Sequence, residues 1–235
     1  MKKFFTGALG WSAVFATLFI ASCGKDNNLP KPPDPTPTKQ NPTLTVSEPA
    51  KALYGQAVSI PFSTAYAKVV LVGNQQQAAV SGSYGPVTVT ADTQLTFVAQ
   101  GEEGTTPATK TVSISVFTQN ETRLICTGSA KWVATNQWAL FPGATTWADA
   151  TASMSCQAPM VFNQNYLVTM QTTACGSPQD SWNNAWTLTA DSIQISNKVQ
   201  AISFVSETVM DLTSRPSTCC GTLTGTLTKT RWVKQ

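Results

Sequence analysis

The sequence contains no histidine, which removes the most common general base and a common metal ligand from every candidate site. Charged residues are scarce, at 11% of the chain. A Gly-x-Ser-x-Gly elbow, a phosphate-binding glycine loop, a calcium loop of alternating acids and a Cys-x-x-Cys zinc spacing are all absent. We therefore expect no catalytic residue, metal or cofactor, and hence no enzyme, although two carboxylates meeting in space as a glycosidase pair stay open at this point.

The few charges are unevenly distributed along the chain. Five of the 15 Lys and Arg residues precede residue 40, whereas only two of the 12 Asp and Glu residues do. Residues 40–235 therefore carry ten charges of each sign, so the net charge of +3 belongs to the N-terminal segment. A neutral folded part gives no reason to expect a nucleic-acid partner.

The N-terminus has the order of an export signal. Lys2 and Lys3 precede an apolar run over residues 4–20, and small residues then precede Cys23. This order predicts a signal peptide over residues 1–22. A secretory signal with a chance cysteine, or a transmembrane helix of about 20 residues, are the alternatives.

Ile20-Ala21-Ser22-Cys23 resembles the lipobox of bacterial lipoproteins. The resemblance implies cleavage before Cys23 and a diacylglyceryl group on its thiol, so that the membrane is a partner through this lipid. Gly24 stands where enteric lipoproteins of the inner membrane carry aspartate, so the analogy implies an exported lipoprotein of the outer membrane. Residues 23–42 are rich in proline and predict an extended polyproline tether; the alternative is a ligand for a proline-binding domain.

Residues 43–117 alternate apolar and polar positions in short runs parted by turn residues. This pattern predicts a sandwich of about seven antiparallel strands. Ser81-Gly82-Ser83-Tyr84 and residues 95–116 resemble bacterial immunoglobulin-like domains. The resemblance implies a spacer module, with adhesion as the alternative.

Residues 121–235 differ in composition, because they hold five of the six cysteines and six of the seven tryptophans. Strand-like runs at hairpin spacing predict an up-and-down antiparallel β-barrel, which makes the whole chain all-β. The expected strands span residues 123–132, 161–170, 186–190, 192–196, 199–205, 208–212 and 221–233.

Met154-Ser155-Cys156, the aromatic pair Phe162 and Tyr166, and Trp186-Thr187-Leu188 resemble lipocalin-like domains of exported bacterial lipoproteins. Gly128-Ser129-Ala130-Lys131-Trp132 departs from the Gly-x-Trp of a lipocalin's first strand. The resemblance implies an eight-stranded barrel with a small internal cavity. The candidate lining residues are Phe162, Tyr166, Trp186 and Leu188.

Cysteines of an exported protein are expected to pair. Cys175 lies where the resembled family often has a second cysteine, and we expect it to pair with Cys156. Cys126 is expected to reach Cys219 or Cys220, because the first and last strands of a closed barrel touch. The alternative is a vicinal Cys219–Cys220 bridge, which an unpaired Cys126 would favour.

The leading functional prediction is a non-enzymatic binding protein that holds a small apolar or amphipathic ligand in the barrel. The rival is a cell-surface structural or glycan-binding protein with a packed barrel, using Trp138, Trp147 and Trp182 in predicted loops. Three further tryptophans are predicted to fill the core, and an alternating threonine row is predicted to form a solvated strand face. These sets are Trp132, Trp186 and Trp232, and Thr222, Thr224, Thr226, Thr228 and Thr230.

Overall fold

The computed structural model describes residues 38–73, 75–77, 81–176, 182–214, 218–219, 222–223 and 225–235. The expected signal peptide, Cys23 and most of the proline tether therefore lie outside the described residues. Residues 39–235 form one structural unit. This unit contains two hydrophobic cores, so it holds the buried apolar surface that independent folding requires.

The described residues between 43 and 114 form seven strands in two antiparallel sheets around the first core. One sheet has the order β1-β2-β5 and the other β4-β3-β6-β7. Both sheets supply buried side chains, and the rings of Phe62 and Phe97 lie 5.8 Å apart. The predicted seven-stranded sandwich is confirmed at this level. The strands are β1 (Thr43–Val46), β2 (Gln56–Ala65), β3 (Val69–Val72), β4 (Gln75–Gln77), β5 (Ser81–Val89), β6 (Thr93–Gln100) and β7 (Ala108–Ile114).

A bulge in the β2–β5 pairing explains a glycine in β5. The register shifts between Val58 and Ile60, and Gly85 approaches this point with a φ of +105°. A Cβ at Gly85 would lie 2.7 Å from the carbonyl oxygen of Val58. Only glycine fits this close backbone contact without displacement.

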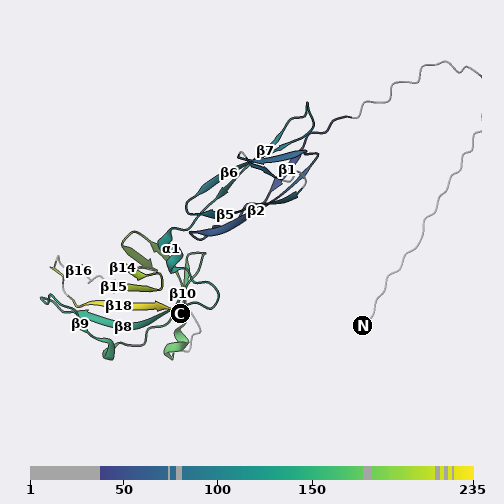
Figure 1. Cartoon of the computed structure of the whole chain (residues 1–235). Coiled ribbons are helices and arrows are strands. Elements are labelled where there is room, and N and C mark those ends of the chain that lie inside the picture. The colour runs from purple at the N-terminus through teal and green to yellow at the C-terminus, as the bar shows by residue number, and fades with distance from the viewer. Residues whose placement is uncertain are drawn as a thin grey trace, which may run out of the picture. The chain divides into compact units, whose positions relative to one another are not determined.

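The described C-terminal part forms a nearly closed ring of eight antiparallel strands in sequence order, which confirms the predicted up-and-down sheet. Figure 1 shows β15, β18 and β8 side by side, and β18 pairs with β8 along its whole length. Between β10 and β8 the ring is joined by the single pair Met160↔Trp132. The ring strands are β8 (Trp132–Leu140), β10 (Met160–Phe162), β11 (Leu167–Met170), β12 (Trp182–Leu188), β13 (Ser192–Ile195), β14 (Lys198–Ser206), β15 (Val209–Ser214) and β18 (Leu227–Lys234).

Shorter elements lie at the margins of the ring. The strand β9 (Ala148–Asp149) pairs with the edge of β8 that faces away from β18. The 3-10 turns η1 (Thr151–Ser153) and η2 (Thr172–Cys175) flank the β10–β11 hairpin in sequence. The pair β16 (Thr218–Cys219) and β17 (Thr222–Leu223) lies between β15 and β18 in sequence.

The first predicted strand, residues 123–132, is wrong. The chain forms the helix α1 (Gln119–Leu124), whose start is fixed by a capping box between Thr118 and Glu121, and the strand begins only at Trp132. The Thr-x-x-Glu signal was present in the sequence. The strand β8 escaped prediction because Ala134 and Thr135, next to a shift in the β18–β8 register, do not alternate as apolar and polar residues.

The helix α1 seals one end of the ring, called here the closed end. The indole Nε1 of Trp132 donates a hydrogen bond of 2.9 Å to the carbonyl oxygen of Leu124. The ammonium group of Lys234 donates to the carbonyl oxygens of Arg123 and Ile125 and lies 5.1 Å from the Trp132 ring centroid. Burial lowers the pKa of Lys234. The opposite end, which carries the Ser196-Asn197 turn, is called the open end.

Candidate functional site

A cavity of about 400 Å³ lies in the half of the ring that faces the open end. Its wall is mixed in character, with apolar side chains, amides and hydroxyls, and one cation. The apolar lining residues are Ala158, Met160, Met170, Ile195, Leu212 and Trp232. The polar lining residues are Gln157, Asn184, Ser196, Asn197, Lys198, Gln200 and Thr230.

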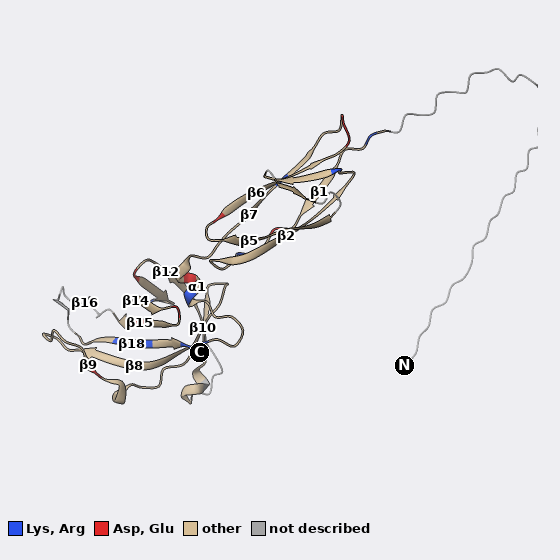
Figure 2. Ribbon diagram, in the orientation of Figure 1, with Lys and Arg blue, Asp and Glu red and all other residues tan. Residues whose placement is uncertain are grey.

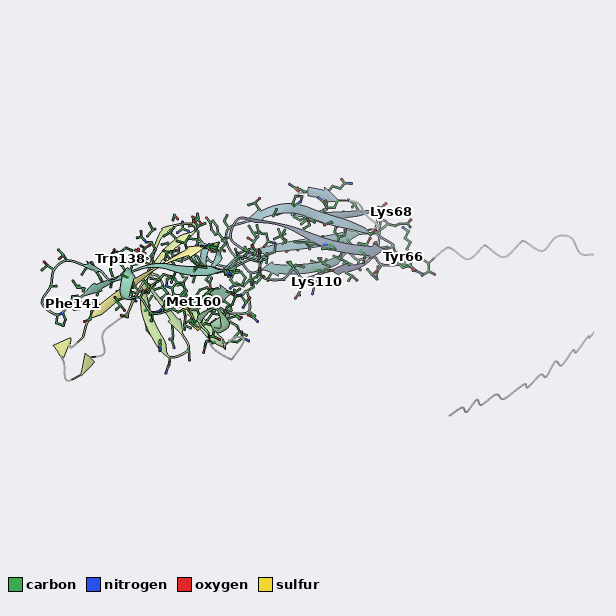
Figure 3. The ribbon with its side chains drawn as sticks, turned by 90° about the horizontal axis from the view of Figure 1, so that it is seen from below. Tyr66, Lys68, Lys110, Trp138, Phe141 and Met160 are labelled. Atoms are coloured by element: carbon green, nitrogen blue, oxygen red, sulfur yellow. A yellow bond between two sulfur atoms is a disulfide. The ribbon has the colours of Figure 1, made fainter. Side chains whose placement is uncertain are left out.

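Strand alternation places these side chains on the inner face of the ring. Met160 and Met170 are opposite each other on β10 and β11, and Figure 3 labels Met160 among the ring strands. On β14, Gln200 lines the cavity, whereas its neighbour Val199 is 44% exposed on the outer face. Because successive residues of a strand face opposite sides, Val199 and Gln200 form a matched pair for comparison.

The prediction that the threonine row is a solvated face is wrong at its C-terminal members. Thr230 is half-buried and lines the cavity, and Thr228 is half-buried and hydrogen-bonded to the Ser214 hydroxyl at 2.8 Å. The row turns inward because closure of the ring places this face of β18 inside. The side chains of Thr222 and Thr224 lie outside the described residues.

Trp232 borders the cavity with a buried polar atom that has no partner. Its side chain is 5% exposed, and its indole Nε1 is buried without a hydrogen-bond acceptor among the described residues. The indole nitrogen of Trp186 is buried in the same way. Trp132, Trp186 and Trp232 are all buried, as predicted for core residues.

The four predicted lining residues do not line this cavity. Phe162 and Trp186 are buried in the closed half of the ring, where their rings pack edge to face at 5.6 Å. Tyr166 packs on Trp186 at 5.1 Å, and Leu188 borders a separate pocket beside α1. Phe162 and Trp186 do face the inside of the ring, but large aromatic side chains fill its closed half. The cavity lies further along the same strands, at smaller and more polar inward positions such as Asn184.

Tyr166 instead belongs to a hydrogen-bond network beside α1. Its hydroxyl donates to Glu121 Oε1 at 2.9 Å and accepts from Lys51 Nζ at 2.6 Å, while its backbone is held at a φ of +62°. Burial raises the pKa of Glu121, but hydrogen bonds from Thr118 and Tyr166 outweigh this effect and lower the pKa overall. Tyr166 therefore has a structural role that accounts for its strained backbone.

The tryptophans of the rival prediction are placed differently from expectation. Trp138 lies within β8 and Trp182 begins β12, so neither lies in a loop; the side chain of Trp182 is outside the described residues. Figure 3 labels Trp138 and the exposed Phe141, which follows β8. Trp147 does precede β9 in a loop. Loop composition misled the prediction, because Asn and Gln in β8 resemble turn residues.

Trp138 and Trp147 contact cations rather than open space. The ammonium of Lys229 lies 4.9 Å from both ring centroids, and the guanidinium of Arg231 lies 5.2 Å from that of Trp138. Arg231 also donates two hydrogen bonds, of 2.8 and 2.9 Å, to the carboxylate of Asp211. Basic residues on β18 are visible in Figure 2. These cation–π and ionic contacts tie β15, β18 and β8 together on the outer face.

The predicted Cys156–Cys175 disulfide is confirmed. Its cysteines flank the β10–β11 hairpin at the open end, and Cys156 precedes the cavity residue Gln157. The predicted bridge from Cys126 is wrong, because Cys126 is a free thiol. Its amide donates to the Phe162 carbonyl at the closed end, whereas Cys219 belongs to the segment that joins β15 to β18 at the open end.

Burial raises the pKa of the Cys126 thiol, which disfavours its reactive thiolate form. The vicinal alternative, Cys219–Cys220, involves side chains outside the described residues.

Neither a protein-family model nor a curated protein matches the sequence. Within the described ranges, no group of three or more His, Cys, Asp or Glu side chains is arranged to hold a metal ion. The same part of the chain contains no helix long and apolar enough to cross a membrane.

Proposed function

We propose that this chain is an exported lipoprotein, anchored in the outer membrane through acylated Cys23, whose ring domain binds a small amphipathic ligand without chemical conversion. Residues 24–42 would act as the tether and the immunoglobulin-like sandwich as a spacer. The observation that carries the binding proposal is the cavity of about 400 Å³ inside the ring. Ligand pockets of small molecules typically measure about 300–1,000 Å³.

The composition of the cavity wall favours an amphipathic ligand over a purely apolar one. Asn184, Gln200 and Thr230 line the cavity together with the apolar residues Met170 and Leu212, and Thr230 is the cross-strand partner of Leu212. Buried amides and hydroxyls gain most when they are hydrogen-bonded. Two methionines add adaptability, because their flexible thioether chains fit ligands of different outline.

The lipocalin-like assignment is supported by the path of the chain and by the first strand. The eight ring strands follow sequence order, as in an up-and-down barrel. Trp132 begins β8 and is buried under α1, although Gly128-Ser129-Ala130-Lys131-Trp132 is longer than Gly-x-Trp. The tryptophan of the first strand thus keeps a buried position at the closed end despite the longer spacing.

The order of the sandwich strands supports the immunoglobulin-like assignment in the same way. The sheets β1-β2-β5 and β4-β3-β6-β7 place non-consecutive strands side by side, as Greek-key sandwiches do. A spacer role needs only a stable module, which one shared core provides.

The rival proposal of a glycan-binding surface is less favoured by the geometry. Sugar rings stack on exposed aromatic faces, whereas the rings of Trp138 and Trp147 are half-buried and in contact with Lys229. Quenching of tryptophan fluorescence by a panel of glycans, with no binding of apolar probes, would favour the rival.

The binding proposal is tested with the neutral fluorescent probe N-phenyl-1-naphthylamine and the unit of residues 39–235. We expect saturable binding with energy transfer from tryptophan, since Trp232 lines the cavity. The substitution Gln200→Trp should fill the cavity and abolish binding, whereas Val199→Trp, on the outer face of the same strand, should not. Equal binding by wild type and both variants would contradict the proposal.

The lipoprotein proposal has its own test, which is independent of the cavity. Intact mass measurement of the mature chain from bacterial membranes should show a polypeptide that begins at Cys23 and carries acyl chains. A mature chain that begins elsewhere, or that lacks acyl mass, would refute this part.

A further inference from the structure

We infer that the ligand carries a negative charge at one end, held at the open end of the cavity by Lys198, with its apolar body against Met160, Met170 and Trp232. This inference rests on the proposed binding function and specifies the chemical class of the ligand as an amphipathic anion.

The lining residues of the cavity carry charge of one sign only, which is positive. Lys198 is the single charged residue among the 13 lining residues, and no Asp or Glu of the described ranges lines the cavity. A ligand cation would therefore meet a like charge and no counter-charge on this wall. A ligand anion would meet one lysine and several hydrogen-bond donors of amide side chains.

The described acidic residues of the ring do not line the cavity. Glu121 belongs to α1, and Asp191 and Glu207 lie in turns at the closed end, where Glu207 pairs with Arg123 at 2.6 Å. Asp149 is exposed on β9, which pairs with β8. Figure 2 shows acidic and basic residues together on α1. Asp211 is neutralised by Arg231 on the outer face, as described above. None of these carboxylates borders the cavity to offset Lys198.

Lys198 stands where an amphipathic anion would keep its charge in water. It is the first residue of β14, it is exposed, and it lines the same cavity as Gln200, two positions further along the strand. The apolar lining residues Leu212 and Trp232 are only 2% and 5% exposed, so they form the deeper wall. A ligand oriented with its anion at Lys198 leaves its charge hydrated and buries its apolar part.

The chemistry of the site therefore matches a flat or flexible apolar body with a terminal carboxylate, sulfonate or similar group.

Two probes that differ by one charged group test the inference. 1-Anilinonaphthalene-8-sulfonate has the skeleton of N-phenyl-1-naphthylamine with an added sulfonate, so a comparison of their dissociation constants isolates the anion. Titrations use the unit of residues 39–235 as wild type, Lys198→Gln, Lys198→Glu and Lys131→Gln. The last variant removes the same charge beside the closed end, where Lys131 pairs through its backbone with Gln235.

We expect Lys198→Gln to raise the dissociation constant of the sulfonate probe about fivefold, because an exposed ion pair contributes little to affinity. The dissociation constant of the neutral probe should not change. Lys198→Glu should weaken binding of the sulfonate probe further, and Lys131→Gln should change the dissociation constant of neither probe. High salt should remove the difference between wild type and Lys198→Gln, because the pair is exposed.

The inference would be overturned if the dissociation constant of the sulfonate probe were unchanged in Lys198→Gln, or if it changed equally in Lys131→Gln. Binding of the neutral probe would still support the proposed function in that case. Failure of both probes to bind the wild type would instead overturn the proposed function, and the inference with it.

Discussion

The Cys156–Cys175 disulfide should stabilise the ring more than its position at the open end suggests. It closes a segment that contains β10 and β11, with a sequence separation of 19. That hairpin pairs with β8 through Met160↔Trp132 alone, which is the shortest strand pairing in the ring. Without the cross-link, the hairpin would gain freedom in the unfolded chain and lose a restraint at the weakly paired seam.

Replacement of both cysteines by alanine should therefore lower the free energy of unfolding by about 3 kcal/mol, from the loop-closure entropy of a segment of this length. For a unit of nearly 200 residues, this corresponds to a fall in the melting temperature of about 6–12 °C. Urea unfolding followed by tryptophan fluorescence measures the change, and wild type under reducing conditions is the matched control. Unfolding of the double variant at the wild-type urea concentration would refute the reasoning.

Three further predictions follow from the closed end and the cysteines. Peptide mapping without reduction should find Cys156 joined to Cys175, Cys219 joined to Cys220, and Cys126 as a free thiol that is alkylated faster after unfolding than in the folded protein; a peptide joining Cys126 to Cys219 would contradict this. Trp132→Phe should cost about 1–3 kcal/mol in urea unfolding, because the carbonyl of Leu124 loses its buried donor, whereas Trp147→Phe at the half-buried outer face should cost less; equal costs would argue against the Trp132 bond. Glu121→Gln should be less stable than wild type at neutral pH. Because the pKa of Glu121 is lowered by folding, its charge stabilises the protein above the ordinary value of 4.5, and this advantage should vanish as the pH falls through the lowered pKa in paired acid titrations; a gap that is independent of pH would count against it.

Local pattern was enough to predict most of the strands. Alternation in Val58, Ile60 and Phe62 predicts one buried face, and the structure buries all three. Such prediction succeeds because strand alternation and turn chemistry depend on neighbours in sequence. It failed at α1 and β8, where a capping box was overlooked and where an irregular register interrupts the period.

Strand alternation is enough to predict the all-β class, composition excludes histidine chemistry, and a family resemblance implies the Cys156–Cys175 pair. Which inward positions leave space depends instead on how the strands pack in three dimensions. Phe162 and Gln200 both face the inside of the ring, yet the first is packed among aromatic rings and the second lines a cavity. The difference depends on which side chains the closing strands bring opposite each position, and ring closure joins residues that are about a hundred positions apart in the chain, such as Ala134 and Trp232.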